Sequence, residues 1–456
     1  MIILGNRIND MKLYNDLKLR FEEPLWALNP ELALFDVVLC QNPAFLKHFE
    51  AEVTKGLKNS NFGRKDSPTV EQIVRAAIYK EIKQLDYREL EIAMYDSNTF
   101  NLFLQLDGRK PFSFTCLQTY ISKISKESIT KLIVEINKLA YQENIETGES
   151  TSTDTTVVQT NVHYPTNNSL IWDCIKTATA LLKKHRKQQK KQKDEDKNNH
   201  IQKLEQQKAN AKKLNYQINN TQKEEQKSLF DPYLAILQKL IDDVKIEIAY
   251  SQKNSWLSKL ESYIEVFEKV YTNAYRYQIL GEKVENSKKI FSIYQTHTDI
   301  IVKGQREVEF GHKVLITRGK SNLILDFDVL KGNPSDKDLY KPAIEKVIEN
   351  YTVIPQNSSC DGGFVTKENL SWAKERGLVN IVFTKITKTM KNIVESIEIE
   401  LLLKKWRGGT EAVISNLKRG FGLDKINWEG WEKFQAKVAW SVLGYNLRVI
   451  TNRLLK

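Results

Sequence analysis

The sequence predicts an α+β or α/β fold, with a mixed sheet flanked by helices, an all-helical N-terminal region and a long helical insertion. Three observations predict it. Apolar residues recur at helical spacing before residue 148, and β-branched residues first gather at 151–159. From Phe291 onward, strand signals and helix signals alternate. This alternation is typical of a sheet covered by helices.

These patterns divide the chain into four predicted parts. Residues 1–148 form a helical N-terminal domain, and residues 149–174 hold the first strand of a core domain. Residues 175–290 form the insertion, and residues 291–456 complete the core and add C-terminal helices. A chain of 456 residues is long enough for two or three domains.

Composition narrows the class of protein. The chain is 41% hydrophobic, which excludes general disorder, and its net charge of +12 favours a polyanionic partner such as nucleic acid. It contains no run of about 18 apolar residues, and Met1–Asn6 does not open a signal peptide, so we expect neither membrane insertion nor export. The cysteines are widely separated, which favours reduced thiols in the cytoplasm over disulfides or a zinc site. They are Cys40, Cys116, Cys174 and Cys360.

The N-terminal domain begins its clearest helix at Thr69-Val70-Glu71-Gln72, which has the form of a capping box. Apolar residues then recur at helical spacing from Val74 to Leu85. Further helices are predicted at Tyr87–Tyr95, Thr99–Leu106, Phe114–Ile124 and Lys126–Glu143. Short helices joined by turns allow a helix-turn-helix, and several lysines suit phosphate contact, so the domain either binds DNA or serves dimerisation. These lysines are Lys110, Lys123, Lys126 and Lys131.

The predicted insertion carries most of the excess charge. Between Ile175 and Phe230 there are 15 Lys and Arg residues against 6 Asp and Glu residues. This stretch lacks Gly and Pro, so it allows a long exposed helix, and Leu204, Ala211 and Ile218 lie seven residues apart. A more apolar helical stretch follows from Pro232 to Ile279. The charged run either contacts the DNA backbone or is a solvated helix face.

The core elements follow from β-branched and apolar runs. Thr151–Gln159 is predicted as a strand, and Val302–Thr317 as a hairpin with Gly311 near its bend. The remaining predicted elements follow one another along the chain. They are a strand at Ser321–Leu330, a helix at Asp338–Glu349, a strand at Val353–Ser359, a helix at Thr366–Arg376, a strand at Asn380–Thr384, and helices at Trp406–Lys418 and Trp431–Leu455.

Two aspartates stand at positions suited to chemistry. Asp154 lies within a strand of neutral residues, where a charge is costly unless it lies at an edge, is paired or binds a cation. Asp361 follows a strand and precedes Gly362-Gly363, at the carboxyl end where α/β proteins place functional residues. A turn or helix-capping role remains an alternative for Asp361.

A third acidic residue has a distinctive spacing to two cations. Arg407, Glu411 and Lys418 stand at i, i+4 and i+11, which places them within about 40° of one another on a helix. One stripe then offers a metal-binding carboxylate between two phosphate-binding cations. A salt-bridged surface stripe has the same pattern. Because Gly408-Gly409 follows Arg407, the helix is also allowed to begin after that residue.

Taken in order, these motifs resemble bacterial insertion-sequence transposases of the DDE class. The motifs are Asp-Thr-Thr-Val-Val (154–158), Phe-Gly-His-Lys (310–313), Cys-Asp-Gly-Gly-Phe (360–364) and Arg-x3-Glu-x6-Lys (407–418). The stretch Thr69–Ile121, with Tyr87-Arg88-Glu89-Leu90 and Asp96-Ser97-Asn98, resembles the helical N-terminal domain of such proteins. The likeness covers most of the chain except the insertion. Lys404 stands where the family usually carries a tyrosine.

The resemblance implies a ribonuclease-H-like core with Asp154, Asp361 and Glu411 as catalytic and metal-binding residues. Two Mg²⁺ ions, for which Mn²⁺ can substitute, would serve cleavage of the element's ends and attack of the freed 3′-hydroxyl on target DNA. Arg407 and Lys418 would bind DNA phosphates. The implied partners are double-stranded terminal inverted repeats and target DNA, held by a homodimer or larger synaptic complex. The implied location is the bacterial cytoplasm, at the nucleoid.

Several other residues offer alternative candidates for a site. Asp326 and Asp328 share one strand face and offer a carboxylate pair, although a solvated face is the commoner reading. Asp336 is interpreted as a turn or N-cap residue. His163 and His312 are expected to be structural, and Trp406 and Trp428 are expected to pack in the core.

The sequence also allows two other functions. One is a transposase-derived DNA-binding protein without catalysis, although all three carboxylates are present. The other is a metal-dependent DNA nuclease without a joining step.

Overall fold

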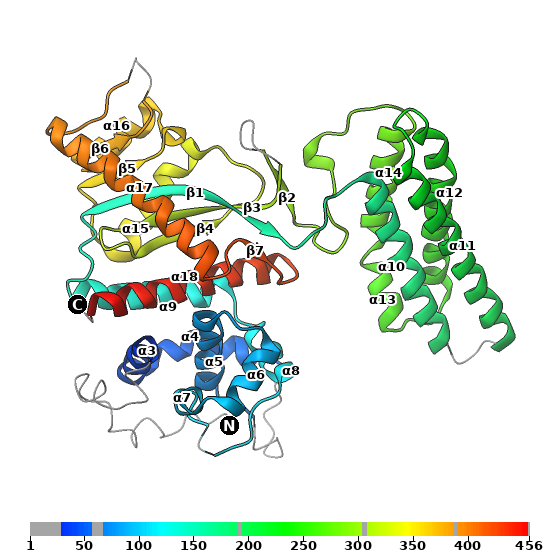
Figure 1. The fold of residues 1–456 in the computed structure, drawn as a ribbon, viewed down its shortest axis with the longest axis horizontal. Coiled ribbons are helices and arrows are strands. Elements are labelled where there is room, and N and C mark those ends of the chain that lie inside the picture. Colours follow the sequence, from blue (N-terminus) through cyan, green and yellow to red (C-terminus); the bar gives the residue numbers. More distant parts are fainter. Residues whose placement is uncertain are drawn as a thin grey trace. The chain divides into compact units, whose positions relative to one another are not determined.

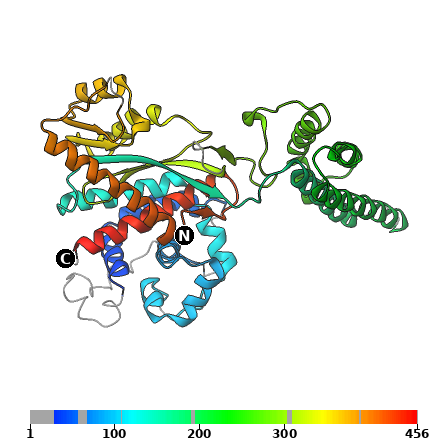
Figure 2. The same cartoon turned by 45° about the horizontal axis from the view of Figure 1, so that its top comes forward.

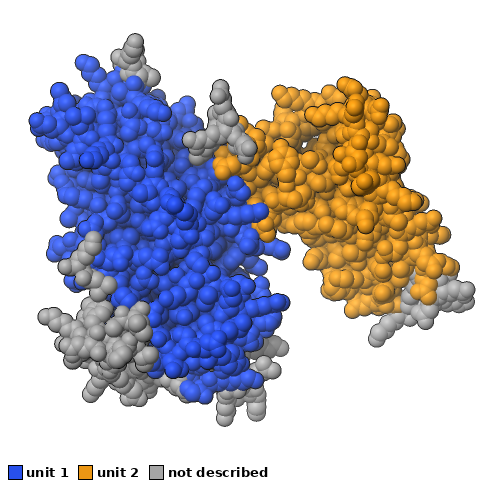
Figure 3. All heavy atoms as spheres, viewed as in Figure 1, with its two compact units in different colours: residues 1–159, 312–456 blue, residues 160–311 orange. Residues whose placement is uncertain are grey.

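The computed structural model describes residues 29–56, 67–106, 108–189, 194–302, 308–386 and 390–454. Figure 1 shows its elements, and Figure 3 colours its two compact units. Unit 1 comprises residues 1–159 and 312–456, and unit 2 comprises residues 160–311. Unit 2 is therefore inserted into the sequence of unit 1. Among the described residues, no helix is long and apolar enough to cross a membrane.

A mixed sheet lies mostly in unit 1, with the long strand β1 (Ser150–Thr160) at its centre, and its strand β2 (Asp299–Ile301) belongs to unit 2. The strand order is β2-β3-β1-β5-β6, with β4 also paired to β3 and β7 to β1. The other strands are β2 (Asp299–Ile301), β3 (Glu309–Arg318), β4 (Ile324–Val329), β5 (Asn357–Cys360), β6 (Asn380–Phe383) and β7 (Lys425–Ile426). The sequence predicted a mixed sheet flanked by helices, and this prediction is confirmed.

The relative direction of paired strands determines which strand ends lie close together. β3 pairs antiparallel with β4, whereas β5 pairs parallel with both β1 and β6. β1 runs antiparallel to β3, because Thr153 contacts Thr317 while Thr160 contacts Phe310, seven residues earlier. Three antiparallel strands followed by two parallel ones agree with the ribonuclease-H-like core that the resemblance implied. The carboxyl ends of β5 and β6 consequently lie together, beside the middle of β1, which continues to Thr160.

Helices cover both faces of this sheet (Figures 1 and 2). One face packs against α15 (Asp336–Tyr351), α9 (Lys126–Gln142) and α18 (Trp431–Leu454). The other face carries α17 (Ile397–Gly420), which contacts β5 and β6. A short 3-10 turn η5 (Gly362–Phe364) and helix α16 (Lys367–Glu375) connect β5 to β6.

The N-terminal helices share the apolar core of unit 1. They are α3 (Pro30–Gln41), η3 (Pro43–Leu46), α4 (Lys47–Val53), α5 (Val70–Lys83), α6 (Tyr87–Asp96), α7 (Asn98–Phe103) and α8 (Phe114–Ile121). The predicted capping box is confirmed, since the Gln72 amide donates to Thr69 Oγ1 and the Thr69 amide donates to Gln72 Oε1. Trp440 of α18 lies fully buried and stacks on Phe49 of α4, so the last helix joins this region to the sheet.

Unit 2 is mainly a helical bundle. Its helices are α10 (Asn167–Gln188), α11 (Asp194–Asn220), α12 (Gln226–Tyr250), α13 (Ser255–Glu261) and α14 (Ile264–Gln278), followed by η4 (Asn286–Lys288). The residues predicted at seven-residue spacing, Leu204, Ala211 and Ile218, are all buried in its core. The charged stretch is thus divided among α10, α11 and the start of α12, and one side of α11 packs into the core of the bundle.

Three predicted boundaries were wrong. Gly311 lies inside β3 opposite Asp299 and not near a bend, and residues 303–307 lie outside the described residues. The predicted strand at 353–359 is shorter and ends later, as Asn357–Cys360. Helix α17 begins at Ile397, because Ser396 caps its N-terminus by accepting a hydrogen bond from the Ile399 amide. The helix then continues through Gly408-Gly409.

Candidate active site

Asp154 and Asp361 follow paired positions on neighbouring parallel strands. Thr153 of β1 lies beside Cys360 of β5, so the next residue on each strand is an aspartate. Side chains alternate along a strand, and Ser152 and Ser359 both contact α17. The two aspartates therefore face α17 as well. The register of one strand pair brings together residues that are 207 positions apart.

The glycine after Asp361 allows a close approach of two chain segments. A Cβ on Gly362 would lie 2.7 Å from the backbone oxygen of Lys385, which cannot move aside without shifting the chain. Thr384, beside Lys385, donates a hydrogen bond of 2.9 Å to Asp361 Oδ1. The absent side chain at Gly362 thus permits the contact that orients the Asp361 carboxylate.

Buried polar contacts hold α17 against the strand that carries Asp154. The hydroxyls of Thr410 and Ser152 are 2.7 Å apart, and Ser359 donates to the Leu403 carbonyl over 3.0 Å. Arg318 of β3 donates through Nε to Thr410 Oγ1 over 2.8 Å and through Nη2 to the Trp406 carbonyl. These contacts determine which residues of α17 lie over the first half of β1 and the end of β5.

Arg407 bridges two of the three candidate carboxylates. Its Nη2 lies 2.7 Å from Asp154 Oδ2, and its Nη1 lies 2.9 Å from Glu411 Oε1. The side chains of Arg407 and Asp154 are 14% and 15% exposed, whereas that of Glu411 is 65% exposed. Arg407 is thus held on the buried side of the site, and Glu411 reaches it from the solvent side.

The two aspartates differ in how readily they ionise. Burial raises the pKa of Asp154, and the charge of Asp361 adds to this, against Arg407 and the Thr155 amide. Burial also opposes ionisation of Asp361, but hydrogen bonds from Gly362 and Thr384, with the charges of Arg407 and Lys385, lower its pKa. Asp361 is therefore the better-stabilised anion, and Asp154 depends on a neighbouring cation.

The described residues contain no group of three His, Cys, Asp or Glu side chains close enough to hold one metal ion in this arrangement. A guanidinium instead lies between Asp154 and Glu411. The donor set nevertheless suits hard divalent cations, which prefer carboxylate oxygens. Because the acidic set already attracts a cation, these residues fit such ions.

Residues 281–447 match a family described as transposase DDE domain. The chain carries a transposase DDE domain. The match includes Asp361 and Glu411, while Asp154 lies ahead of it, separated by residues 155–280, most of which belong to unit 2. Neither a curated protein nor a solved structure shows significant similarity to the chain. Transposases act on DNA, and the DDE family generally uses divalent metal ions.

Two further positions of the DDE domain motif lie along the same helix. Lys418 shares the stripe of Arg407 and Glu411, and its Nζ is 3.8 Å from Asp424 Oδ1, a 69% exposed carboxylate. Lys418 contacts neither Asp154 nor Asp361 in any described interaction. Lys404, at the position of the family's tyrosine, pairs with Glu400 over 2.6 Å.

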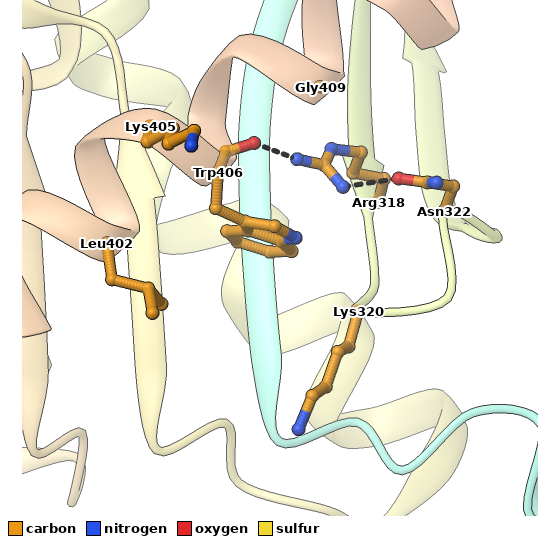
Figure 4. A pocket seen from close by; sticks show the side chains of 7 residues that line it. All are labelled: Arg318, Lys320, Asn322, Leu402, Lys405, Trp406 and Gly409. Carbon is orange, nitrogen blue, oxygen red and sulfur yellow. Dashed lines mark hydrogen bonds between the residues drawn. The ribbon is translucent and has the colours of Figure 1, made fainter.

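A pocket of about 480 Å³ lies beside α17 in the DDE domain (Figure 4). Arg318 lines it, and its guanidinium lies 4.1 Å from the Trp406 ring centroid. Burial lowers the pKa of Arg318 to about 10. Asn322 accepts from Nη1 over 2.6 Å. The remaining lining residues are Lys320, Leu402, Lys405 and Gly409. Trp406 thus packs against a buried cation next to Arg407.

The sequence analysis did not predict a second polar network, which joins Thr155 in the middle of β1 to the DDE domain. Asp336 accepts from Thr155 Oγ1 over 3.2 Å and from Lys313 Nζ over 3.1 Å. A Cβ on Gly363 would lie 3.0 Å from Asp336 Oδ2, so this carboxylate also approaches the turn after Asp361. Asp336 is the first residue of α15, and Ser335 holds the predicted N-cap position. Lys313 within the Phe-Gly-His-Lys motif was the available signal.

Two expectations about competing residues were tested by burial. His312 is fully buried between Trp431 and Phe434, which supports the structural role predicted for it. The solvated strand face predicted for Asp326 was wrong, because α9 and α15 cover it and leave Asp326 only 7% exposed. Its neighbour Asp328 pairs with Lys126 and Lys346.

Proposed function

We propose that this protein is the transposase of a bacterial insertion sequence, which cleaves DNA at the ends of its element and joins the freed 3′-hydroxyl to target DNA. One observation carries the proposal. Asp361 and Glu411 lie within the transposase DDE domain, Asp154 of β1 and Asp361 each follow one member of the pair Thr153–Cys360 on two adjacent parallel strands, and Glu411 meets Asp154 through the shared Arg407.

Asp154, Asp361 and Glu411 would hold two Mg²⁺ ions, for which Mn²⁺ can substitute. Bound there, such ions activate an attacking oxygen and stabilise the leaving oxygen of a phosphodiester. The low pKa of Asp361 keeps its carboxylate available at neutral pH. Asp154 lies in a more buried position and gains the most from a cation beside it.

Arg407 would then act on DNA. Its guanidinium pairs with the acidic set, and its Nε is buried without a hydrogen-bond acceptor among the described residues. A phosphate oxygen is the acceptor that a guanidinium prefers, since the fork of N–H donors matches its geometry. Lys418, further along α17 on the same stripe, would contact a second phosphate as a point charge.

The substrates would be double-stranded DNA, both the terminal inverted repeats and the target, in the bacterial cytoplasm at the nucleoid. A homodimer or larger synaptic complex would pair two DNA ends. The region 1–148 would serve DNA binding or dimerisation. These assignments extend the family resemblance to the whole chain.

The test uses a donor plasmid that carries the inverted repeats found beside the gene. Purified protein with Mg²⁺ is expected to nick the element ends and to attach their 3′-hydroxyls to a target plasmid. The variants Asp154→Asn, Asp361→Asn and Glu411→Gln are each expected to lower both reactions on the order of 10³-fold. Glu398→Gln is the matched control, because Glu398 is an exposed carboxylate in the first turn of the same helix.

Three outcomes would contradict the proposal. Cleavage without joining would favour a nuclease, and DNA binding without cleavage would favour a DNA-binding protein derived from a transposase. Full activity of any one acid variant would remove that residue from the site. Thermal unfolding of each variant verifies that a lost reaction is not lost folding.

A further inference from the structure

Helix α11 presents an unusual outer face. Leu204, Ala211 and Ile218 bury one side of it in the bundle of unit 2. The opposite side is exposed and consists mostly of carboxamides and lysines. Its members are Asn198, Asn199, Gln202, Lys203, Gln206, Asn210, Lys213, Tyr216, Gln217 and Asn220. This set is named the α11 outer face.

The α11 outer face carries no carboxylate. The only acidic residue between 198 and 220 is Glu205, which lies beside this face and pairs with Lys183 Nζ over 2.7 Å. An exposed helix face is ordinarily laced with both signs of charge, which favours solubility. The absence of acidic groups here leaves a surface complementary to a polyanion.

The central carboxamides of this face are available to a ligand. No hydrogen bond within the described structure engages the side chains of Gln202, Gln206, Asn210 or Gln217. A carboxamide offers a donor and an acceptor together, which matches the N6 and N7 atoms of adenine in the major groove. Lysines beside them at Lys203 and Lys213 suit backbone phosphates.

The neighbouring helix α12 provides a contrast within the same bundle. Its exposed residues include the carboxylates Asp231 and Asp242, and Lys245 is paired with Glu268 over 2.6 Å. Such a surface repels DNA as much as it attracts it. The scarcity of acidic groups is therefore a property of residues 198–220, which follow the acidic start of α11 at Asp194, Glu195 and Asp196, and not of unit 2 in general.

The dimensions of α11 also suit duplex DNA. The outer face extends over residues 198–220, about 33 Å of helix at 1.5 Å per residue. The major groove of B-form DNA is about 12 Å wide and admits one helix. A straight helix contacts base edges over only part of such a length, so its ends would meet phosphates.

We propose that α11 reads duplex DNA in the major groove, with Gln206 and Asn210 on base edges and Lys203 and Lys213 on phosphates. The inference rests on the proposed function in one respect, that DNA is the substrate. It assigns unit 2 a sequence-reading role and predicts that the preferred sites contain A·T pairs.

The experiment uses the full chain and a duplex library with a randomised segment of about 20 base pairs, longer than the roughly ten pairs of one helical turn. Wild-type protein is expected to select an A·T-containing consensus. The double variant Gln206→Ala/Asn210→Ala is expected to lose about 10-fold or more in affinity for that consensus, with unchanged affinity for random duplex. Lys203→Gln/Lys213→Gln is expected to weaken binding to every duplex and to reduce the salt slope by about 1.8.

The matched control is Lys227→Gln/Lys239→Gln, two exposed lysines on α12. It is expected to bind as wild type does. The inference is overturned if the carboxamide variant selects the wild-type consensus with wild-type affinity. Equal binding to a double-stranded RNA of the selected sequence would also overturn it, because the major groove of RNA is too narrow for a helix.

Mn²⁺-dependent cleavage of supercoiled plasmid, measured on the same proteins, separates the two proposals. If the α11 variants cleave plasmid and still select the wild-type consensus, the inference is refuted and the proposed function stands. If the α11 variants lose the consensus but the wild-type protein cleaves no plasmid, the inference stands and the proposed function is refuted. Circular dichroism verifies that the bundle remains folded, since all substituted side chains are exposed.

Discussion

The guanidinium of Arg407 lies 2.7 Å from the Asp154 carboxylate and is the counter-ion of that buried acid. Burial lowers the pKa of Arg407, but Asp154, Asp361 and Glu411 outweigh it and raise the pKa overall. Removing one partner of such a pair leaves the other charge poorly solvated. Divalent cations entering this site would therefore compete with Arg407 for Asp154.

This competition leads to a prediction with two opposite signs. Arg407→Gln removes a positive charge from the acidic set, so Mn²⁺ is expected to bind several-fold more tightly, as measured by isothermal titration calorimetry. DNA cleavage is expected to fall on the order of 10²-fold, because the phosphate contact is lost. Lys404→Gln is the control, since Lys404 pairs with Glu400 away from the aspartates. Weaker Mn²⁺ binding by Arg407→Gln would show that Arg407 positions the acids instead.

Adjacent glycines in α17 are expected to respond in opposite directions to alanine. Nothing lies within 4 Å of a Cβ on Gly408, whereas a Cβ on Gly409 would lie 2.8 Å from Arg318 Nη2. Gly408→Ala is expected to raise the free energy of unfolding by about 0.8–1 kcal/mol through helix propensity. Gly409→Ala is expected to lower it and to reduce cleavage, because it displaces the buried Arg318 that anchors α17. Urea unfolding measures both, and equal effects would contradict the role of Arg318.

Lys418 can be tested by the salt dependence of DNA binding. Its closest carboxylate is 3.8 Å away and largely exposed, so the lysine remains available for phosphate. Lys418→Gln is expected to reduce the slope of log K against log salt by about 0.9, without a change in melting temperature. Arg419→Gln is the control, because Arg419 is exposed one position along and donates to Ser415. Identical slopes for the two variants would remove Lys418 from the DNA contact.

Local signals in the sequence predicted several features of this molecule. The capping box at Thr69 and Gln72 was predictable, since it depends on residues three positions apart. The placement of Asp154 within a strand followed from the β-branched residues on both sides of it, and that of Asp361 after a strand from the Gly-Gly pair that follows it. Both patterns are short enough to be recognised without knowledge of the fold.

Long-range packing was not predictable in the same way. The break between α10 and α11 and the burial of Asp326 depend on which helix covers which surface. Gly408-Gly409 allowed a helix start, yet α17 passes through both, because Ser152, Ser359 and Arg318 bind it on either side. Tertiary contacts here outweigh the low helix propensity of glycine. The Asp336 network likewise joins residues 181 positions apart.

Asp326 is expected to make the stability of the fold depend on pH. Burial raises its pKa to about 7, with Lys346 opposing and Asp328 adding to the rise, and its Oδ2 accepts no hydrogen bond among the described residues. The folded protein therefore holds this proton more tightly than the unfolded chain, whose aspartates titrate near 3.9. The resulting stability is complete below about pH 4 and is lost as the pH rises through about 7.

Asp326→Asn is consequently expected to be more stable than wild type at pH 8, by about 1–3 kcal/mol in urea unfolding, and to approach it at pH 4. Asp328→Asn should show the opposite sign. Burial opposes ionisation of Asp328, but Lys126 and Lys346 lower its pKa, so its contribution is present above about pH 4 and is lost as the pH falls. That variant is expected to be less stable at pH 8. If Asp326→Asn is the less stable of the two at pH 8, the buried carboxyl is ionised and paired in the folded protein.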